Sequence, residues 1–210
     1  MKSSVYTVVY SLALGTVCAL LLTGASIIAH PYKEANARAA EERTILKVLL
    51  VPVSQKATPA EVSRMFEASV SKIEVGGQTW YTMIDVSDGC ATPGAVAIPF
   101  SGPGLWGPVK GFIALEPDMR TVRNIIFHEQ EETPGLGGEI GSTWFQERFR
   151  GRSIVDRDGK PGIAILRDGK PIGPNEVDGI TGATMTCEKV KLMLNRSIEM
   201  IMQEQKTDAR

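Results

Sequence analysis

The sequence predicts an α+β protein in which a single N-terminal transmembrane helix is followed by one mixed-sheet domain. The first observation is that no Asp, Glu, Lys or Arg occurs from Ser3 to Tyr32. The second is that the rest of the chain contains both strand-type runs and helix-type segments, with a helix at the end. The length of 210 residues leaves room for one membrane element and one domain of ordinary size. We expect an anchor at residues 1–32, a membrane-proximal helical and strand region at 33–100, and a further domain at 101–210.

Composition excludes several classes of function. The 23 Lys and Arg residues are balanced by 24 Asp and Glu residues, so no basic excess is present and nucleic acid is not an expected partner. The 3 cysteines form no CxxC pair and only 2 histidines accompany them, so no metal site is expected. A disulfide between Cys90 and Cys187 and a pair of free thiols both remain open.

The apolar N-terminal segment is the predicted anchor. Val5 to Ala29 would span about 37 Å as a helix, which is enough to cross a bilayer, and Pro31 is expected to end that helix. A cleaved signal peptide is the alternative, because small residues at 23–25 (TGA) offer a cleavage site. The flanking charges do not decide the orientation, because large domains translocate largely regardless of them.

The order of elements after the anchor follows from periodicity and turn residues. Residues 33–51 are rich in helix formers and should continue or restart the anchor helix. A helix from Pro59 to Val70 should begin at the capping residue Thr58. Strands are expected at 79–86, 95–100, 109–115 and 121–127, with a turn at 87–94. A short helix at 142–150, two strands around Asp158 and Gly159, and a final amphipathic helix at 186–205 complete the domain.

The segment most informative about function is DGITGATMT, from Asp178 to Thr186, which opens directly onto the last helix. A helix N-terminus presents free backbone N–H groups and a positive dipole end, and both favour a phosphate. Gly182 and Ala183 remove side-chain bulk beside Thr184, so its hydroxyl should be reachable. An ordinary helix cap by Thr181 or Thr184 would explain the same residues without a ligand.

Three motifs in this order carry a resemblance to a known family. DGITGAT resembles the flavinylation motif, at whose last threonine, here Thr184, a flavin transferase attaches FMN through a phosphoester. ETPGLG at residues 132–137 is similar to the signature of the same FMN-binding domain. The GLW of residues 104–106 is similar to a loop of the NqrC subunits of sodium-translocating NADH:quinone oxidoreductases. The related RnfG subunits of Rnf electron-transport complexes are the competing assignment.

The resemblance implies a covalent-FMN electron carrier that works only within an oxidoreductase complex. Its partners would be the other subunits and, during maturation, a flavin transferase; its soluble domain would lie on the periplasmic side of the bacterial inner membrane. No catalytic acid or base is expected, because flavin electron transfer needs none. The residues expected to contact FMN, besides Thr184, are Asp178, Thr181, Gly182, Ala183, Thr186, Glu132, Thr133, Gly135, Leu136, Gly137, Leu105 and Trp106.

Two other functions remain open from the sequence. One is an anchored extracytoplasmic module that binds a partner and carries no flavin. The other is a separate periplasmic flavoprotein reductase. Asp178 likewise has two interpretations: it organises the loop or assists the transferase, or it forms a simple Asx turn before Gly179.

Overall fold

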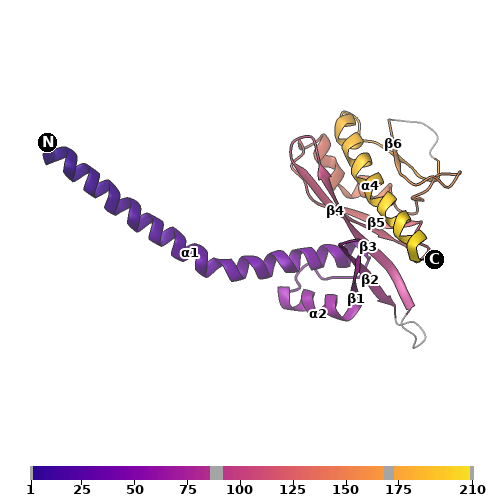
Figure 1. The fold of residues 1–210 in the computed structure, drawn as a ribbon, viewed down its shortest axis with the longest axis horizontal. Helices are drawn as coiled ribbons and strands as arrows, with labels where there is room; N and C mark the ends of the chain where they lie inside the picture. Colours follow the sequence, from indigo (N-terminus) through magenta and orange to yellow (C-terminus); the bar gives the residue numbers. More distant parts are fainter. Residues whose placement is uncertain (1, 86–91, 168–172, 209–210) are drawn as a thin grey trace. The chain divides into compact units, whose positions relative to one another are not determined.

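The structure, a computed structural model, describes residues 2–85, 92–167 and 173–208. The chain divides into two compact units, Met1–Glu41 and Glu42–Arg210, which are taken separately below. The elements labelled in Figure 1 are α1 (Lys2–Val48), α2 (Pro59–Ser69), β1 (Val70–Val75), β2 (Gln78–Asp85), β3 (Thr92–Pro103), β4 (Pro108–Leu115), β5 (Val122–Glu129), η2 (Gly137–Gly141), α3 (Thr143–Glu147), β6 (Ala164–Leu166), β7 (Glu176–Asp178) and α4 (Thr184–Asp208).

The first unit consists of most of α1. This helix is long and apolar enough to cross a membrane, although a signal sequence near the N-terminus passes the same test. Pro31 lies inside α1, so the expectation that it ends the helix is wrong. A proline removes one backbone hydrogen bond and strains the preceding turn. The helix-forming residues that follow Pro31 continue the helix nevertheless.

The second unit begins with the last turns of α1, which are buried in its core through Ile45, Leu46 and Val48. The chain then turns back towards α2. Arg43 holds this turn by donating hydrogen bonds to the backbone carbonyls of residues 54, 55 and 57 at 3.0, 3.2 and 2.6 Å.

Helix α2 begins where the sequence predicts. The Thr58 hydroxyl accepts a hydrogen bond from the Glu61 amide, and the Glu61 carboxylate accepts one from the Thr58 amide. This capping box satisfies backbone donors that the first turn of a helix leaves free. Pro59 takes the first helical position, where its missing N–H costs nothing.

A five-stranded antiparallel sheet in the order β1-β2-β3-β4-β5 forms the centre of the second unit. Both of its faces are covered. Val109, Ile113 and Leu115 of β4 belong to the core shared with α3 and α4, whereas Phe112 and Ala114 belong to the core shared with α2 and the end of α1. Burial on both faces explains why these strands are apolar at successive positions.

The predicted α+β architecture, with an apolar N-terminal helix and a mixed-sheet domain, is confirmed. Strands β2 to β5 and helices α2, α3 and α4 match expected elements to within a few residues. The expected turn at 87–94 falls mostly on residues outside the described part. Strand β3 runs across the expected domain boundary at residue 100, and the division at residues 32 and 100 stays a prediction.

Three details differ from expectation. Strand β1 is unexpected, because Ser71, Lys72 and Glu74 give this edge strand no apolar alternation. Of the two strands expected around Asp158, the described residues contain only β6, which pairs in parallel with the unexpected β7. An isolated bridge between Val155 and Pro161 takes the place of the other.

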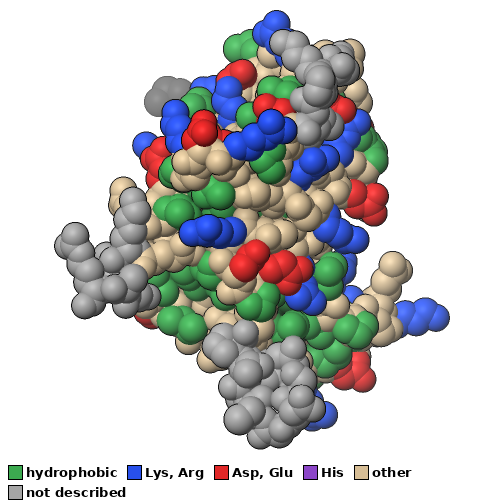
Figure 2. Space-filling view, turned by 90° about the vertical axis from the view of Figure 1, so that its right-hand side faces the viewer, with side chains coloured by type: hydrophobic (Ala, Val, Ile, Leu, Met, Phe, Trp, Pro, Cys, Tyr) green, Lys and Arg blue, Asp and Glu red, His purple; other side chains and the backbone are tan. Residues whose placement is uncertain are grey.

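One face of the molecule carries both signs of charge. On the face drawn in Figure 2, basic and acidic side chains are interspersed with hydrophobic ones. This agrees with the formal net charge of -1.

Candidate functional site

Three loops that are distant in the sequence meet around one cleft in the second unit. The cleft has a volume of about 340 Å³. The hairpin between β3 and β4, the loop that leads into η2, and the start of α4 each contribute to it. The lining residues are Leu105, Trp106, Glu132, Thr133, Leu136, Gly137, Gly182, Ala183, Thr184, Met185 and Thr186.

Most of the residues expected to form the site line this cleft, but three of them do not, and one lining residue was not expected. Asp178, Thr181 and Gly135 are not among the described residues that line the cleft. Met185 does line it, with 62% of its surface exposed, and sequence reasoning missed it. The signal was weak, because one methionine in the first turn of an amphipathic helix has no distinguishing pattern.

Thr184 is the first residue of α4 and is partly exposed in the cleft. The Cys187 amide donates to the Ala183 carbonyl at 3.0 Å, so Ala183 occupies the N-cap position. Thr184 is therefore not the capping residue, and the alternative in which it caps the helix is wrong. Gly182, with φ of 80°, takes a backbone conformation that a side chain would disfavour. Because the methyl group of Ala183 cannot accept a hydrogen bond, the first turn receives no side-chain cap from this residue.

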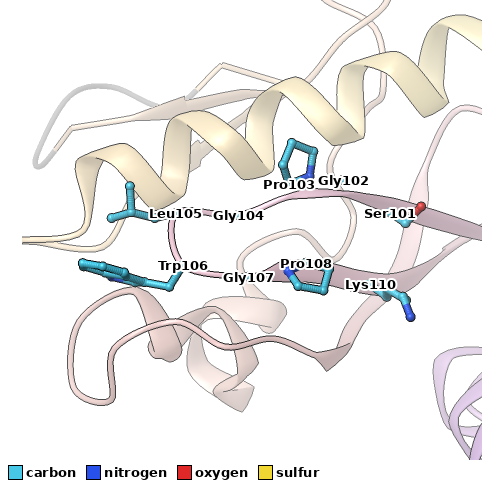
Figure 3. A pocket seen from close by; sticks show the side chains of 9 residues that line it. All are labelled: Ser101, Gly102, Pro103, Gly104, Leu105, Trp106, Gly107, Pro108 and Lys110. Atoms are coloured by element: carbon cyan, nitrogen blue, oxygen red, sulfur yellow. The ribbon is translucent and has the colours of Figure 1, made fainter.

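The rim of the cleft is apolar and exposed. Leu105, Trp106 and Leu136 have exposed fractions of 40%, 70% and 46%. Figure 3 shows Leu105 and Trp106 at the tip of the hairpin between β3 and β4, where a second hollow of about 510 Å³ follows the hairpin. Clustered exposed apolar side chains mark a place where a ligand or partner is bound.

A buried carboxylate lies behind this rim. Glu132 is only 4% exposed. Its Oε1 accepts hydrogen bonds from the amides of Leu105 and Trp106 at 2.6 and 3.3 Å, and its Oε2 accepts one from the Thr186 hydroxyl at 2.7 Å. One side chain therefore connects all three loops of the cleft.

Arg148 organises the segment before α4, and sequence reasoning missed it as well. Its Nη1 donates to the backbone carbonyls of Asp178 and Gly179 at 3.1 and 2.9 Å, and its guanidinium lies 4.7 Å from the ring of Trp144. Asp178 Oδ1 is buried without a hydrogen-bond partner among the described residues. The contact with Arg148 arises only through folding, since 30 residues separate the two positions.

Cys187 lies in the first turns of α4 as a buried free thiol. Burial raises the pKa of this thiol, and the charge of Glu188 acts in the same direction, although a hydrogen bond from the Ile180 amide opposes the rise. Cys90, the other cysteine of the disulfide that the sequence leaves open, lies outside the described residues. The described part of the chain contains no cluster of His, Cys, Asp and Glu suited to a metal ion.

The lining fits a flavin mononucleotide in two respects. The exposed Leu, Trp and Met side chains offer an apolar wall to a flat ring system. The start of α4 offers backbone N–H groups and a positive dipole end to a phosphate. Thr184, which carries a hydroxyl, lines the same cleft.

The family comparison matches the part of the chain that forms the cleft. Residues 104–199 match the family model of the FMN-binding domain. All three loops of the cleft lie within this range. Over these residues the chain is similar to the FMN-binding domain, the same domain that its motifs resemble.

The particular relatives are the C subunits of Na(+)-translocating NADH-quinone reductases. The chain is 40% identical over 97 residues to that of Vibrio vulnificus strain YJ016, which is 46% of this chain and 38% of the relative. It is 45% identical over 92 residues to that of Vibrio campbellii, which is 43% of this chain and 35% of the relative. The match thus spans less than two fifths of the length of these curated relatives.

Solved structures agree with this resemblance over a larger part of the chain. The corresponding reductase subunit from Parabacteroides distasonis superposes with a TM-score of 0.67 at 26% identity, covering 81% of this chain and 94% of that one. NqrC from Shewanella oneidensis gives a TM-score of 0.68 at 21% identity, covering 81% and 99%. The second likeness supports the fold alone. The resemblance to NqrC subunits predicted from the three motifs is confirmed.

Proposed function

We propose that this protein is an electron-carrier subunit of a membrane NADH:quinone oxidoreductase complex, with FMN bound covalently through a phosphoester to Thr184. The observation that carries the proposal is the position of Thr184. Its hydroxyl lies at the first residue of α4, inside the cleft where the three motif loops meet. The names of the relatives support the same class of complex.

The chain's own residues would bind and orient the cofactor. The first-turn N–H groups of α4 favour the phosphate, with a helix-dipole contribution of about 0.3 to 1 kcal/mol. Leu105, Trp106, Leu136 and Met185 would pack against the apolar ring and exclude water from it. When bound, FMN supplies the electron-transfer chemistry, so the protein needs no acid or base of its own.

The partners and the compartment belong to the same proposal. The protein would assemble with the other subunits in the bacterial inner membrane, anchored by α1. A flavin transferase would modify Thr184 during maturation, on the periplasmic side. Support comes from the apolar α1 and from the identity of the relatives as subunits of a reductase.

Thr184→Val tests the attachment site, because valine keeps the shape of threonine and removes the hydroxyl. The full chain is expressed with a flavin transferase and denatured, and flavin fluorescence is measured in the gel, with peptide mass locating the adduct. We expect the fluorescent band to disappear in Thr184→Val.

Two control variants sharpen this test. Thr143→Ala removes an exposed hydroxyl outside the cleft and should leave the band intact, and Thr184→Ser should retain some labelling. A fluorescent Thr184→Val band would refute the attachment site. A wild-type protein that stays dark beside an active transferase would favour the flavin-free module.

A further inference from the structure

Glu132 occupies an unusual position for a carboxylate. It is buried, and among the described residues no Lys, Arg or His lies within ion-pair distance of it. A buried carboxylate is costly unless hydrogen bonds replace its water. Here the donors are two consecutive amides at the hairpin tip, 27 and 26 residues away, and a hydroxyl 54 residues away. Such charge-assisted bonds are stronger than neutral ones.

Two glycines leave the space that this carboxylate fills. A Cβ atom at Gly104 would lie 2.5 Å from Glu132 Oε1. A Cβ atom at Gly137 would lie 2.7 Å from Glu132 Oε2 and 2.5 Å from the Thr186 hydroxyl. The GLW and ETPGLG motifs each therefore contain a glycine that allows the carboxylate to reach its donors.

The hairpin tip is hydrogen-bonded to the rest of the site through this carboxylate. The tip is closed internally by a hydrogen bond from the Gly104 amide to the Gly107 carbonyl at 2.8 Å. The side chains of Leu105 and Trp106 are exposed, but their amides turn inward to Glu132. Through Thr186, the same carboxylate is bonded to the first turn of α4, two residues after Thr184.

We propose, on the basis of the proposed function, that Glu132 is a positioning residue that fixes the apolar wall of Leu105 and Trp106 opposite Thr184. It acts through the two loops it joins and does not exchange electrons or protons with the cofactor. Without Glu132, the hairpin tip moves away from α4, and the flavin ring loses its contacts with Leu105 and Trp106.

The test compares Glu132→Ala and Glu132→Gln in the full chain, with Glu129→Gln as a control that changes an exposed carboxylate paired with Lys110. The first measurement is the rate of covalent flavin incorporation by the transferase. The second is hydrogen–deuterium exchange, measured by mass spectrometry on the unmodified protein, in peptides covering residues 101–107 and 109–115.

In Glu132→Ala we expect faster exchange confined to residues 101–107 and flavin incorporation slowed about tenfold or more, as misplacement at a reacting site typically does. Glutamine keeps an acceptor for both amides, and the Thr186 hydroxyl can turn to accept from its NH₂ group. Glu132→Gln should therefore restore slow exchange and most of the incorporation rate. Glu129→Gln should match the wild type.

The proposal is overturned if Glu132→Ala takes up flavin at the wild-type rate, or if exchange accelerates equally in residues 109–115. Absence of rescue by glutamine would also overturn it. The exchange measurement needs no flavin, so it tests Glu132 even if the wild type proves unmodified and the proposed function fails.

Discussion

At the scale of single residues, two residues that line the cleft also take part in the packing behind it. Thr186 and Gly137 are both expected to contact the cofactor, and both line the cleft. Thr186 is also buried and donates its hydroxyl to Glu132, and the space beside Gly137 is filled by these two side chains. Substitutions here change the packing behind the cleft before they change any ligand contact.

Gly137→Ala should therefore destabilise the protein by about 1 to 3 kcal/mol, because its methyl group would overlap Glu132 and Thr186. Gly141→Ala is the matched control, since nothing lies within 4 Å of the Cβ atom it would add. Thermal denaturation of the two variants in detergent measures the difference. Equal melting temperatures would contradict the close packing at Gly137.

At the scale of elements, short sequence patterns predict those elements that are stabilised by residues a few positions apart. The capping box and Pro59 define the start of α2, and the hydrophobic periodicity defines α4. The turn between β4 and β5 is equally local. Asp118 there accepts hydrogen bonds from the amides of Arg120 and Thr121 at 2.8 and 2.9 Å, and from the Thr121 hydroxyl at 2.6 Å.

The ionisation of Asp118 in this turn should make the stability of the fold depend on pH. Burial alone would raise the pKa of Asp118, but the hydrogen bonds from Thr121 and Arg120 and the charge of Arg120 outweigh it and lower the pKa. A lowered folded-state pKa stabilises the fold above the unfolded value of about 4, and this contribution is lost as the pH falls through the folded value.

Asp118→Asn should therefore be less stable than the wild type at pH 7. The difference in the free energy of unfolding should be less than about 1 kcal/mol, because this turn is exposed. The gap should narrow at pH 3, below the unfolded value of about 4, because there the unfolded state binds the proton more readily than the folded state. Melting temperatures at the two pH values give the comparison, with the exposed Glu147→Gln as control. A gap of unchanged size at pH 3 would rule out the ionised Asp118 as its source.

At the scale of the whole molecule, α1 links the membrane-type segment to the domain without a break. It runs from Lys2 to Val48, and its last turns bury Ile45 and Leu46 in the core of the second unit. A cleaved signal peptide normally precedes a separate mature domain. The proposed membrane anchor requires that residues 1–32 are retained in the mature protein.

The intact mass of the protein extracted from membranes should accordingly include residues 1–32, and extraction should require detergent. A mature N-terminus near residues 23–25, with the protein found in the soluble fraction, would show cleavage instead. Expression of residues 33–210 alone provides the mass standard for a chain without the anchor.

Composition and short-range patterns were enough to establish the fold class, the apolar first helix, four of the strands, the start of α2 and the motif loops, because each depends on composition or on neighbours a few residues apart. Folding in three dimensions was needed for the course of α1 through Pro31, the pairing of β1, β6 and β7, and the roles of Arg148, Met185 and Glu132. Glu132 gains its partners from residues 26 to 54 positions away. Such contacts form when apolar burial folds both faces of the sheet, and no local pattern in the chain encodes them.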